Sequence, residues 1–171
     1  MKVVITGAES SGKTTLFKSL EDFYNIKGAK EYAREYLSNI NREYFKSDLS
    51  SIAQGQIKYE FDVKDSFPNL VLCDSDALTI KIWSNYKYGD CDKEILEMLS
   101  SFPADLYLLL SPDIPWEEDP LRENPNNREE LFDLYKMEIE QLKIPYFIIS
   151  GDKQNRLDSA ISIIDNFISN K

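Results

Sequence analysis

The amino-acid sequence predicts an α/β fold in which a five-stranded, mainly parallel sheet lies between two layers of helices. Three observations support this prediction: short apolar runs bounded by turn residues, longer segments with helical periodicity between them, and a glycine-rich loop directly after the first run. The length of 171 residues suits one domain with its own apolar core. We therefore expect residues 1–171 to form a single domain.

Four apolar runs are expected to be strands of this sheet, and a weaker fifth strand is expected near residues 27–30. Consecutive apolar residues are typical of strands that are buried on both faces, as in parallel sheets covered by helices. The four runs are residues 3–5, 70–73, 106–110 and 146–149.

The segments between the strands place apolar residues at helical spacing, which indicates helices that bury one face. A first helix is expected over Lys13–Tyr24, directly after the glycine-rich loop. Further stripes of this kind are Ile52, Ile57 and Phe61, then Ile95, Leu96 and Leu99, and finally Ile161, Ile164, Phe167 and Ile168. Residues 112–128 lack such a period and contain several prolines, so we expect either a solvated loop or a mobile lid over an active site.

Composition excludes several classes of function. Lys and Arg number 20 against 30 Asp and Glu, which gives a formal charge of -10 and argues against a nucleic-acid or membrane partner. There is no histidine, so a general base has to be a carboxylate, or a Lys, Tyr or Cys with a shifted pKa. With no signal-peptide pattern and no apolar run of membrane-spanning length, we expect a cytoplasmic protein. The oligomeric state stays open.

The glycine-rich loop matches the phosphate-binding pattern G-x-x-x-x-G-K-[ST] in full, from Gly7 to Thr14. Backbone N–H groups of such a loop and the N terminus of the following helix hold a triphosphate. Lys13 is expected on the β- and γ-phosphates and the Thr14 hydroxyl on Mg²⁺. This motif predicts a three-layer P-loop NTPase fold of the nucleoside- and nucleotide-kinase type, with ATP and Mg²⁺ as cofactors. The expected cofactor-binding residues are Gly7, Glu9, Ser10, Ser11, Gly12, Lys13, Thr14 and Thr15.

Carboxylates follow two of the predicted strands, at the sheet edge where ligands of open parallel sheets bind. Asp74 is expected to hold Mg²⁺ together with Thr14, and Asp76 to cap the next helix or contact substrate. A capping role for Asp74 is the alternative. Glu31 is the leading candidate for the general base and Asp76 the second, while Arg34 is expected on a ribose or phosphate oxygen. An ordinary charged helix start is the alternative for Glu31 and Arg34.

Aromatic and charged residues of two further segments are candidates for the acceptor site. Arg122 in the irregular segment is expected to stabilise the negative charge on the transferring phosphoryl group. Trp116 and Asp119 are expected beside the substrate. The aromatic residues Trp83, Tyr86 and Tyr88 either pack in the core and surface or stack on a planar ring.

Taken together, these residues resemble the nicotinamide riboside (ribosylnicotinamide) kinase domain of NadR-type proteins, P-loop kinases related to AAA-like ATPases. The resemblance runs along nearly the whole chain. Its matching segments are Gly7 to Thr14, Glu-Tyr-Ala-Arg-Glu-Tyr at 31–36, Asp-Ser-Asp at 74–76 with Thr79, Trp-Glu-Glu-Asp-Pro-Leu-Arg at 116–122, and Lys-Ile-Pro-Tyr at 143–146. One departure is Pro120, where the family typically has glycine, and it bears on the shape of the lid.

The resemblance implies ATP-dependent phosphorylation of the 5′-hydroxyl of nicotinamide riboside, a small-molecule substrate, to nicotinamide mononucleotide. Without histidine, this chain cannot form the His-rich phosphate motif of the adenylyltransferase that accompanies such kinases. Another small-molecule or deoxynucleoside kinase, or a regulatory P-loop ATPase without catalysis, remains the alternative. The expected catalytic residues are Lys13, Glu31, Arg34, Asp74 and Arg122; the metal ligands are Thr14 and Asp74; and the substrate-binding residues are Glu31, Arg34, Asp76, Trp83, Tyr86, Tyr88, Trp116 and Asp119.

Overall fold

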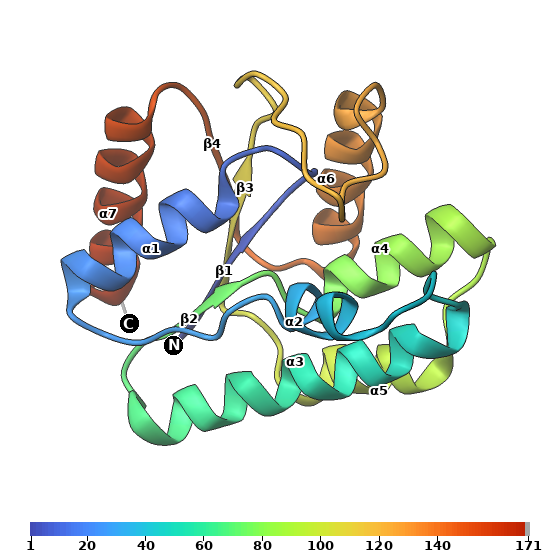
Figure 1. Cartoon of the computed structure of the whole chain (residues 1–171). Coiled ribbons are helices and arrows are strands. Elements are labelled where there is room, and N and C mark those ends of the chain that lie inside the picture. The colour runs from blue at the N-terminus through green and yellow to red at the C-terminus, as the bar shows by residue number, and fades with distance from the viewer. Residues whose placement is uncertain (170–171) are drawn as a thin grey trace.

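A computed structural model describes residues 1–169 and shows four parallel strands in the order β2-β1-β3-β4, with helices on both faces (Figure 1). The strands are β1 (Lys2–Thr6), β2 (Val71–Asp74), β3 (Leu106–Leu110) and β4 (Tyr146–Ile149). The helices are α1 (Lys13–Tyr24), α2 (Tyr32–Asn39), α3 (Lys46–Ser66), α4 (Ala77–Tyr88), α5 (Lys93–Ser101), α6 (Arg128–Leu142) and α7 (Lys153–Ser169).

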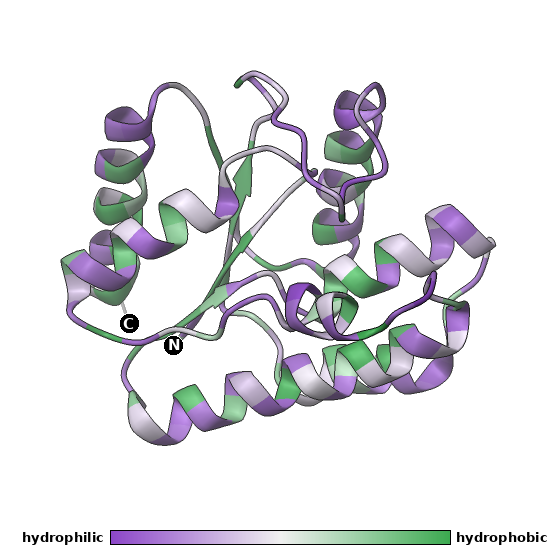
Figure 2. Ribbon diagram, viewed as in Figure 1, coloured by the Kyte–Doolittle hydropathy of each residue, from purple (hydrophilic) through white to green (hydrophobic). Residues whose placement is uncertain are grey.

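The sheet separates two apolar clusters because side chains alternate across each strand. Val3 and Ile5 of β1 point to the face covered by α1 and α7, where they join Leu20 and Ile164. Val4 points to the opposite face, which is covered by α4, α5 and α6. Figure 2 shows the hydrophobic strands between helices whose outer surfaces are hydrophilic. The predicted three-layer α/β fold is therefore confirmed.

The predicted fifth strand is reduced to one isolated parallel bridge between Ala29 and Cys73 at the outer edge of β2. The Ala29 N–H donates to the Leu72 carbonyl, and the Asp74 N–H donates to the Ala29 carbonyl, both at 2.8 Å. Gly28 permits this close approach, since a Cβ there would lie 2.6 Å from the Leu72 carbonyl oxygen. The segment thus follows the sheet edge and delivers Glu31 beside the end of β2.

A buried polar cluster lies under α3, where the sequence predicts an apolar face. Ile52 is buried as predicted, but Phe61 is exposed, and Glu60 takes a buried position instead. The Lys2 ammonium donates to Glu60 Oε2 at 2.6 Å and to the Phe102 carbonyl at 2.8 Å. Burial raises the pKa of Glu60 to about 7, although Lys2 opposes that shift.

The irregular segment 111–127 has no helix or strand, as predicted, and lies at the same end of the molecule as the loop after β1 (Figure 1). We refer to residues 111–127 as the lid. Within residues 1–169, no helix combines the length and apolar character needed to cross a membrane.

Candidate active site

The phosphate-binding loop connects the end of β1 to the first turn of α1. Gly7 and Gly12 have φ angles of 135° and 86°, which side chains other than hydrogen rarely allow. A Cβ at Gly7 would also lie 2.8 Å from the Leu110 carbonyl oxygen. The Lys13 ammonium folds back over the loop and donates to the carbonyls of Gly7 and Ala8 at 2.9 and 2.8 Å. The loop therefore places the Lys13 ammonium where the phosphates of a nucleotide would bind.

Thr14 and Asp74 form the pair that the metal hypothesis requires. The Thr14 hydroxyl donates to Asp74 Oδ2 at 2.8 Å. The other oxygen, Asp74 Oδ1, is buried and has no hydrogen-bond partner among the described residues. Burial raises the pKa of Asp74, while Lys13 and the Thr14 hydrogen bond lower it. Mg²⁺ prefers oxygen ligands, retains waters and needs only one or two carboxylates, so an unpartnered carboxylate oxygen beside a hydroxyl fits it.

Glu31 lies at the N-terminal end of α2 and faces the same cavity as the phosphate loop. This cavity has a volume of about 140 Å³ and is lined by Lys13, Glu31, Arg34, Trp83 and Arg122, among others. No hydrogen bond to the Glu31 carboxylate occurs within residues 1–169, in contrast to Asp74. Burial raises the pKa of Glu31, Lys13 lowers it and Asp74 raises it further. Glu31 is thus an available carboxylate close to a strong cation.

The lid is docked on the phosphate loop through two side chains of the loop itself. Glu9 Oε2 accepts the backbone N–H groups of Glu123 and Asn124 at 3.0 and 2.9 Å. The Ser10 hydroxyl accepts the N–H of Glu117 at 2.9 Å. The side chains of Glu9 and Ser10, predicted to bind the cofactor, are therefore used to hold the lid.

Two arginines join the lid to the rest of the site. Arg34 of α2 pairs with Asp119 at 2.9 Å, which connects the lid to α2. Arg122 donates to the Glu117 carbonyl and lies 3.4 Å from the Ser10 hydroxyl. Both guanidinium groups line the cavity with Lys13, so the structure brings three predicted cations together.

An aromatic cavity of about 170 Å³ adjoins the phosphate loop under the lid. Trp83 and Tyr86 line it, as does Tyr44, whose ring stacks on Trp83 with centroids 6.4 Å apart. Glu9 and Glu123 add carboxylates to the wall. Lys87 lines it too, with its ammonium 3.9 Å from the Tyr44 ring centroid and 3.0 Å from Glu123 Oε1, so the cavity combines ring faces with charges of both signs.

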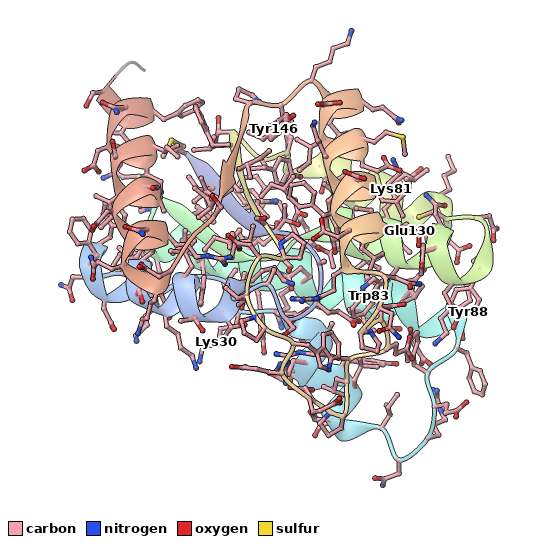
Figure 3. The ribbon with its side chains drawn as sticks, turned by 90° about the horizontal axis from the view of Figure 1, so that it is seen from above. Lys30, Lys81, Trp83, Tyr88, Glu130 and Tyr146 are labelled. Atoms are coloured by element: carbon pink, nitrogen blue, oxygen red, sulfur yellow. The ribbon has the colours of Figure 1, made fainter. Side chains whose placement is uncertain are left out.

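Three predicted substrate residues have other positions in the structure. Asp76 caps α4, accepting the Leu78 N–H on Oδ1 and the Tyr107 hydroxyl on Oδ2, so the capping alternative is correct and neither oxygen is available to substrate. Tyr88 packs against the apolar cluster that α2, α3, α4 and α5 form together. Tyr88 follows Trp83 by five residues, so the two side chains leave α4 in directions about 140° apart. Figure 3 shows Tyr88 at the edge of the molecule.

Trp116 lies in the lid rather than in the wall of the aromatic cavity. The guanidinium carbons of Arg122 and Arg128 are 5.8 and 6.0 Å from its ring centroid. Its indole Nε1 is buried and has no hydrogen-bond partner among the described residues. Trp116 thus contacts one arginine of the lid and the first residue of α6.

Two contributors were not predicted. Tyr44 comes from the irregular connection between α2 and α3, where a lone tyrosine gives no sequence signal. Arg156 of α7 is buried and donates to the carbonyls of Ser11, Ser111 and Gly151, while it also pairs with Asp113. It fastens the phosphate loop to the ends of β3 and β4, and only the folded chain brings these carbonyls together.

A phosphate loop with its lysine and hydroxyl, a carboxylate at the end of the neighbouring strand and a docked lid define a P-loop protein of the kinase type. Comparison with known sequences agrees: the chain belongs to the family described as "AAA domain", which matches residues 2–156.

Among curated relatives, the trifunctional NAD biosynthesis/regulator protein NadR of Escherichia coli (strain K12) is 34% identical over 128 residues. The match covers 70% of this chain and 30% of NadR, so the chain spans less than a third of that protein.

Solved structures show the same fold. A NadR crystal structure in complex with NR is 21% identical with a TM-score of 0.79, covering 98% of this chain and 50% of that one. A NadR structure with NAD and AMP-PNP is 25% identical with a TM-score of 0.72, covering 98% and 49%. Deoxyadenosine kinase from M. mycoides with bound dATP is 13% identical with a TM-score of 0.59, covering 96% and 100%.

Proposed function

We propose that this protein transfers the γ-phosphoryl group of ATP to the 5′-hydroxyl of nicotinamide riboside and so forms nicotinamide mononucleotide. The observation that carries the proposal is the position of Glu31, an unbonded carboxylate in the cavity that Lys13, Arg34 and Trp83 also line. The similarity to NadR, which has been crystallised with NR and with AMP-PNP, supports the choice of acceptor and of ATP.

The phosphate side of the reaction uses the loop and its cations. The loop backbone and Lys13 bind the triphosphate, and Thr14 with Asp74 holds Mg²⁺. The metal, when bound, neutralises charge on the β- and γ-phosphate oxygens. Arg34 and Arg122 line the same cavity and stabilise charge on the transferring group, which a docked lid shields from water.

The acceptor side requires a base and a site for the ring. Glu31 takes the proton from the 5′-hydroxyl as the oxygen attacks phosphorus, because it is the carboxylate left without a partner when Asp74 is bonded to Thr14. The nicotinamide ring carries a positive charge in this substrate. The aromatic cavity with Tyr44, Trp83 and Tyr86 supplies ring faces. Glu9 supplies the opposite charge there, since Glu123 is paired with Lys87.

The test is a coupled ADP-release assay with nicotinamide riboside, the common ribonucleosides and the deoxynucleosides as acceptors. Glu31→Gln keeps the shape and removes the base, so kcat falls at least about a hundredfold. ATP binding by calorimetry stays unchanged. Glu35→Gln is the matched control, since Glu35 lies on the same helix and accepts a hydrogen bond from Tyr59 instead.

The outcomes separate the alternatives. A full rate in Glu31→Gln refutes Glu31 as the base. A preference for a deoxynucleoside in kcat/KM replaces the acceptor but keeps the kinase. ATP hydrolysis that no acceptor stimulates supports the regulatory ATPase instead.

A further inference from the structure

The cavity in front of the phosphate loop continues into a smaller recess between the loop, α4 and α6. This inner recess has a volume of about 30 Å³ and shares Lys13, Glu31 and Trp83 with the main cavity. Thr79 of α4 and Tyr135 of α6 line it as well. The inner recess therefore adjoins the cavity in front of the phosphate loop at residues that include Glu31.

The Thr79 hydroxyl in this recess is buried without a partner. Thr79 is 5% exposed, and its Oγ1 makes no hydrogen bond within residues 1–169. Nearly all buried polar side-chain atoms in proteins have a partner, so an exception requires an explanation. Its backbone N–H bonds the Asp76 carbonyl at 3.1 Å, which fixes the residue in the first turn of α4. The hydroxyl is thus held in place in the recess, and the Tyr135 hydroxyl is the neighbouring group that interacts with it.

Tyr135 brings a second hydroxyl to the same recess. Its side chain is buried, and burial raises the pKa of the phenol, so it stays neutral and able both to donate and to accept. Two neutral hydroxyls are suited to another hydroxyl, which is also both donor and acceptor. Glu9 and Glu31 also line the recess, and their negative charge disfavours a phosphate there.

We propose that Thr79, with Tyr135 beside it, binds a secondary hydroxyl of the acceptor's sugar and makes the enzyme select ribosides over deoxyribosides. This inference rests on the proposed function. The sugar carries the reacting 5′-hydroxyl, so the polar wall next to Glu31 meets the sugar and not the ring. A recess of this size admits one water-sized group, which suits a hydroxyl and excludes an aromatic ring.

The size of the effect follows from what a buried hydroxyl loses. A site built to hydrogen-bond a substrate hydroxyl discriminates strongly against the analogue that lacks it, because its own polar groups are then left unpaired. Removing the Thr79 hydroxyl removes one such bond, so we expect the riboside-to-deoxyriboside ratio of kcat/KM to fall about tenfold.

The experiment measures kcat/KM for nicotinamide riboside, adenosine and cytidine, each with its 2′-deoxy and 3′-deoxy counterpart. Thr79→Val is isosteric and lacks the hydroxyl; Thr79→Ser retains it and is the control. We expect the valine variant to lose riboside activity while the rate with the deoxy compound at the contacted position is unchanged, and the serine variant to keep the wild-type ratio. If Thr79→Val unfolds, Tyr135→Phe serves as the second test.

An unchanged ratio in the valine or phenylalanine variant overturns the inference, as does an equal loss with both members of each pair. A wild-type preference for deoxyribosides overturns it too. If another riboside is the best acceptor, the proposed function fails, but the ratio for that riboside still decides the role of Thr79. The two failures are therefore distinguishable.

Discussion

Glu9 offers the sharpest test of how the lid is held. It occupies a variable position of the phosphate loop, and its Oε2 accepts both the Glu123 and Asn124 N–H groups. A hydrogen bond to a charged group contributes about 1.5–3 kcal/mol when buried. These bonds are partly exposed, and competing hydrogen bonds to water reduce the free energy that they contribute. We take about 1–2 kcal/mol for the two together, which corresponds to about a 5–30-fold shift toward an undocked lid.

Glu9→Ala tests this value directly. Hydrogen exchange of the Glu123 and Asn124 amides should accelerate by about the same 5–30-fold factor, while amides of β1 and β3 keep wild-type rates. Glu118→Ala is the control, because Glu118 is an exposed acid of the lid. We also expect the KM for the acceptor to rise more than kcat falls. Equal exchange rates of the two amides in the Glu9→Ala and Glu118→Ala variants would contradict the role of Glu9 in holding the lid.

Three further predictions concern titratable groups. Asp74→Asn should raise the Mg²⁺ concentration for half-maximal rate at least about ten- to hundredfold, the loss found even for groups that only support a metal ligand. An equal shift in Ser75→Ala would contradict the metal role of Asp74. Because burial raises the pKa of Glu31 above its ordinary value of 4.5, the acidic limb of kcat/KM against pH should lie above that value and disappear in Glu31→Gln. Burial raises the pKa of Glu60 to about 7 in the native state, so between pH 4.5 and 7 the native state binds more protons than the unfolded chain and stability falls as pH rises. The unfolding temperature of Glu60→Gln should no longer depend on pH in this range, whereas that of Asp62→Asn should still fall as pH rises. An unchanged pH dependence in Glu60→Gln would mean that another group causes it.

The phosphate loop and the sheet were predictable because each is fixed by local chemistry. Anion binding demands glycines, a lysine and a hydroxyl at set spacing, and strands buried on both faces demand consecutive apolar residues. The helix expected over Lys13–Tyr24 has those bounds in the structure. The 2.8 Å contact between Thr14 and Asp74 is the geometry that the metal hypothesis needs, while the binding of metal there stays a prediction.

The acceptor side was less predictable because it depends on contacts between distant segments. The sequence shows that a residue is aromatic but not which face it occupies, so it left packing and ring stacking open for Tyr88, and it gave no sign of Tyr44. On α3 the periodic signal failed for another reason: Glu60 is buried because Lys2, far away in the sequence, neutralises it. Such pairs violate the rule that buried positions are apolar, and only the tertiary structure reveals them.

The two carboxylates at the end of the sheet have the same chemistry but different neighbours, and the neighbours decide their roles. Burial raises the pKa of both Glu31 and Asp74. Asp74 gains a hydrogen bond from Thr14, which stabilises its charged form and leaves its other oxygen for the metal that we propose. Glu31 gains no such bond, so its charge depends on Lys13 and is available to a substrate proton. Without histidine, a fold can still separate metal ligand from base by giving one carboxylate a partner and withholding it from the other.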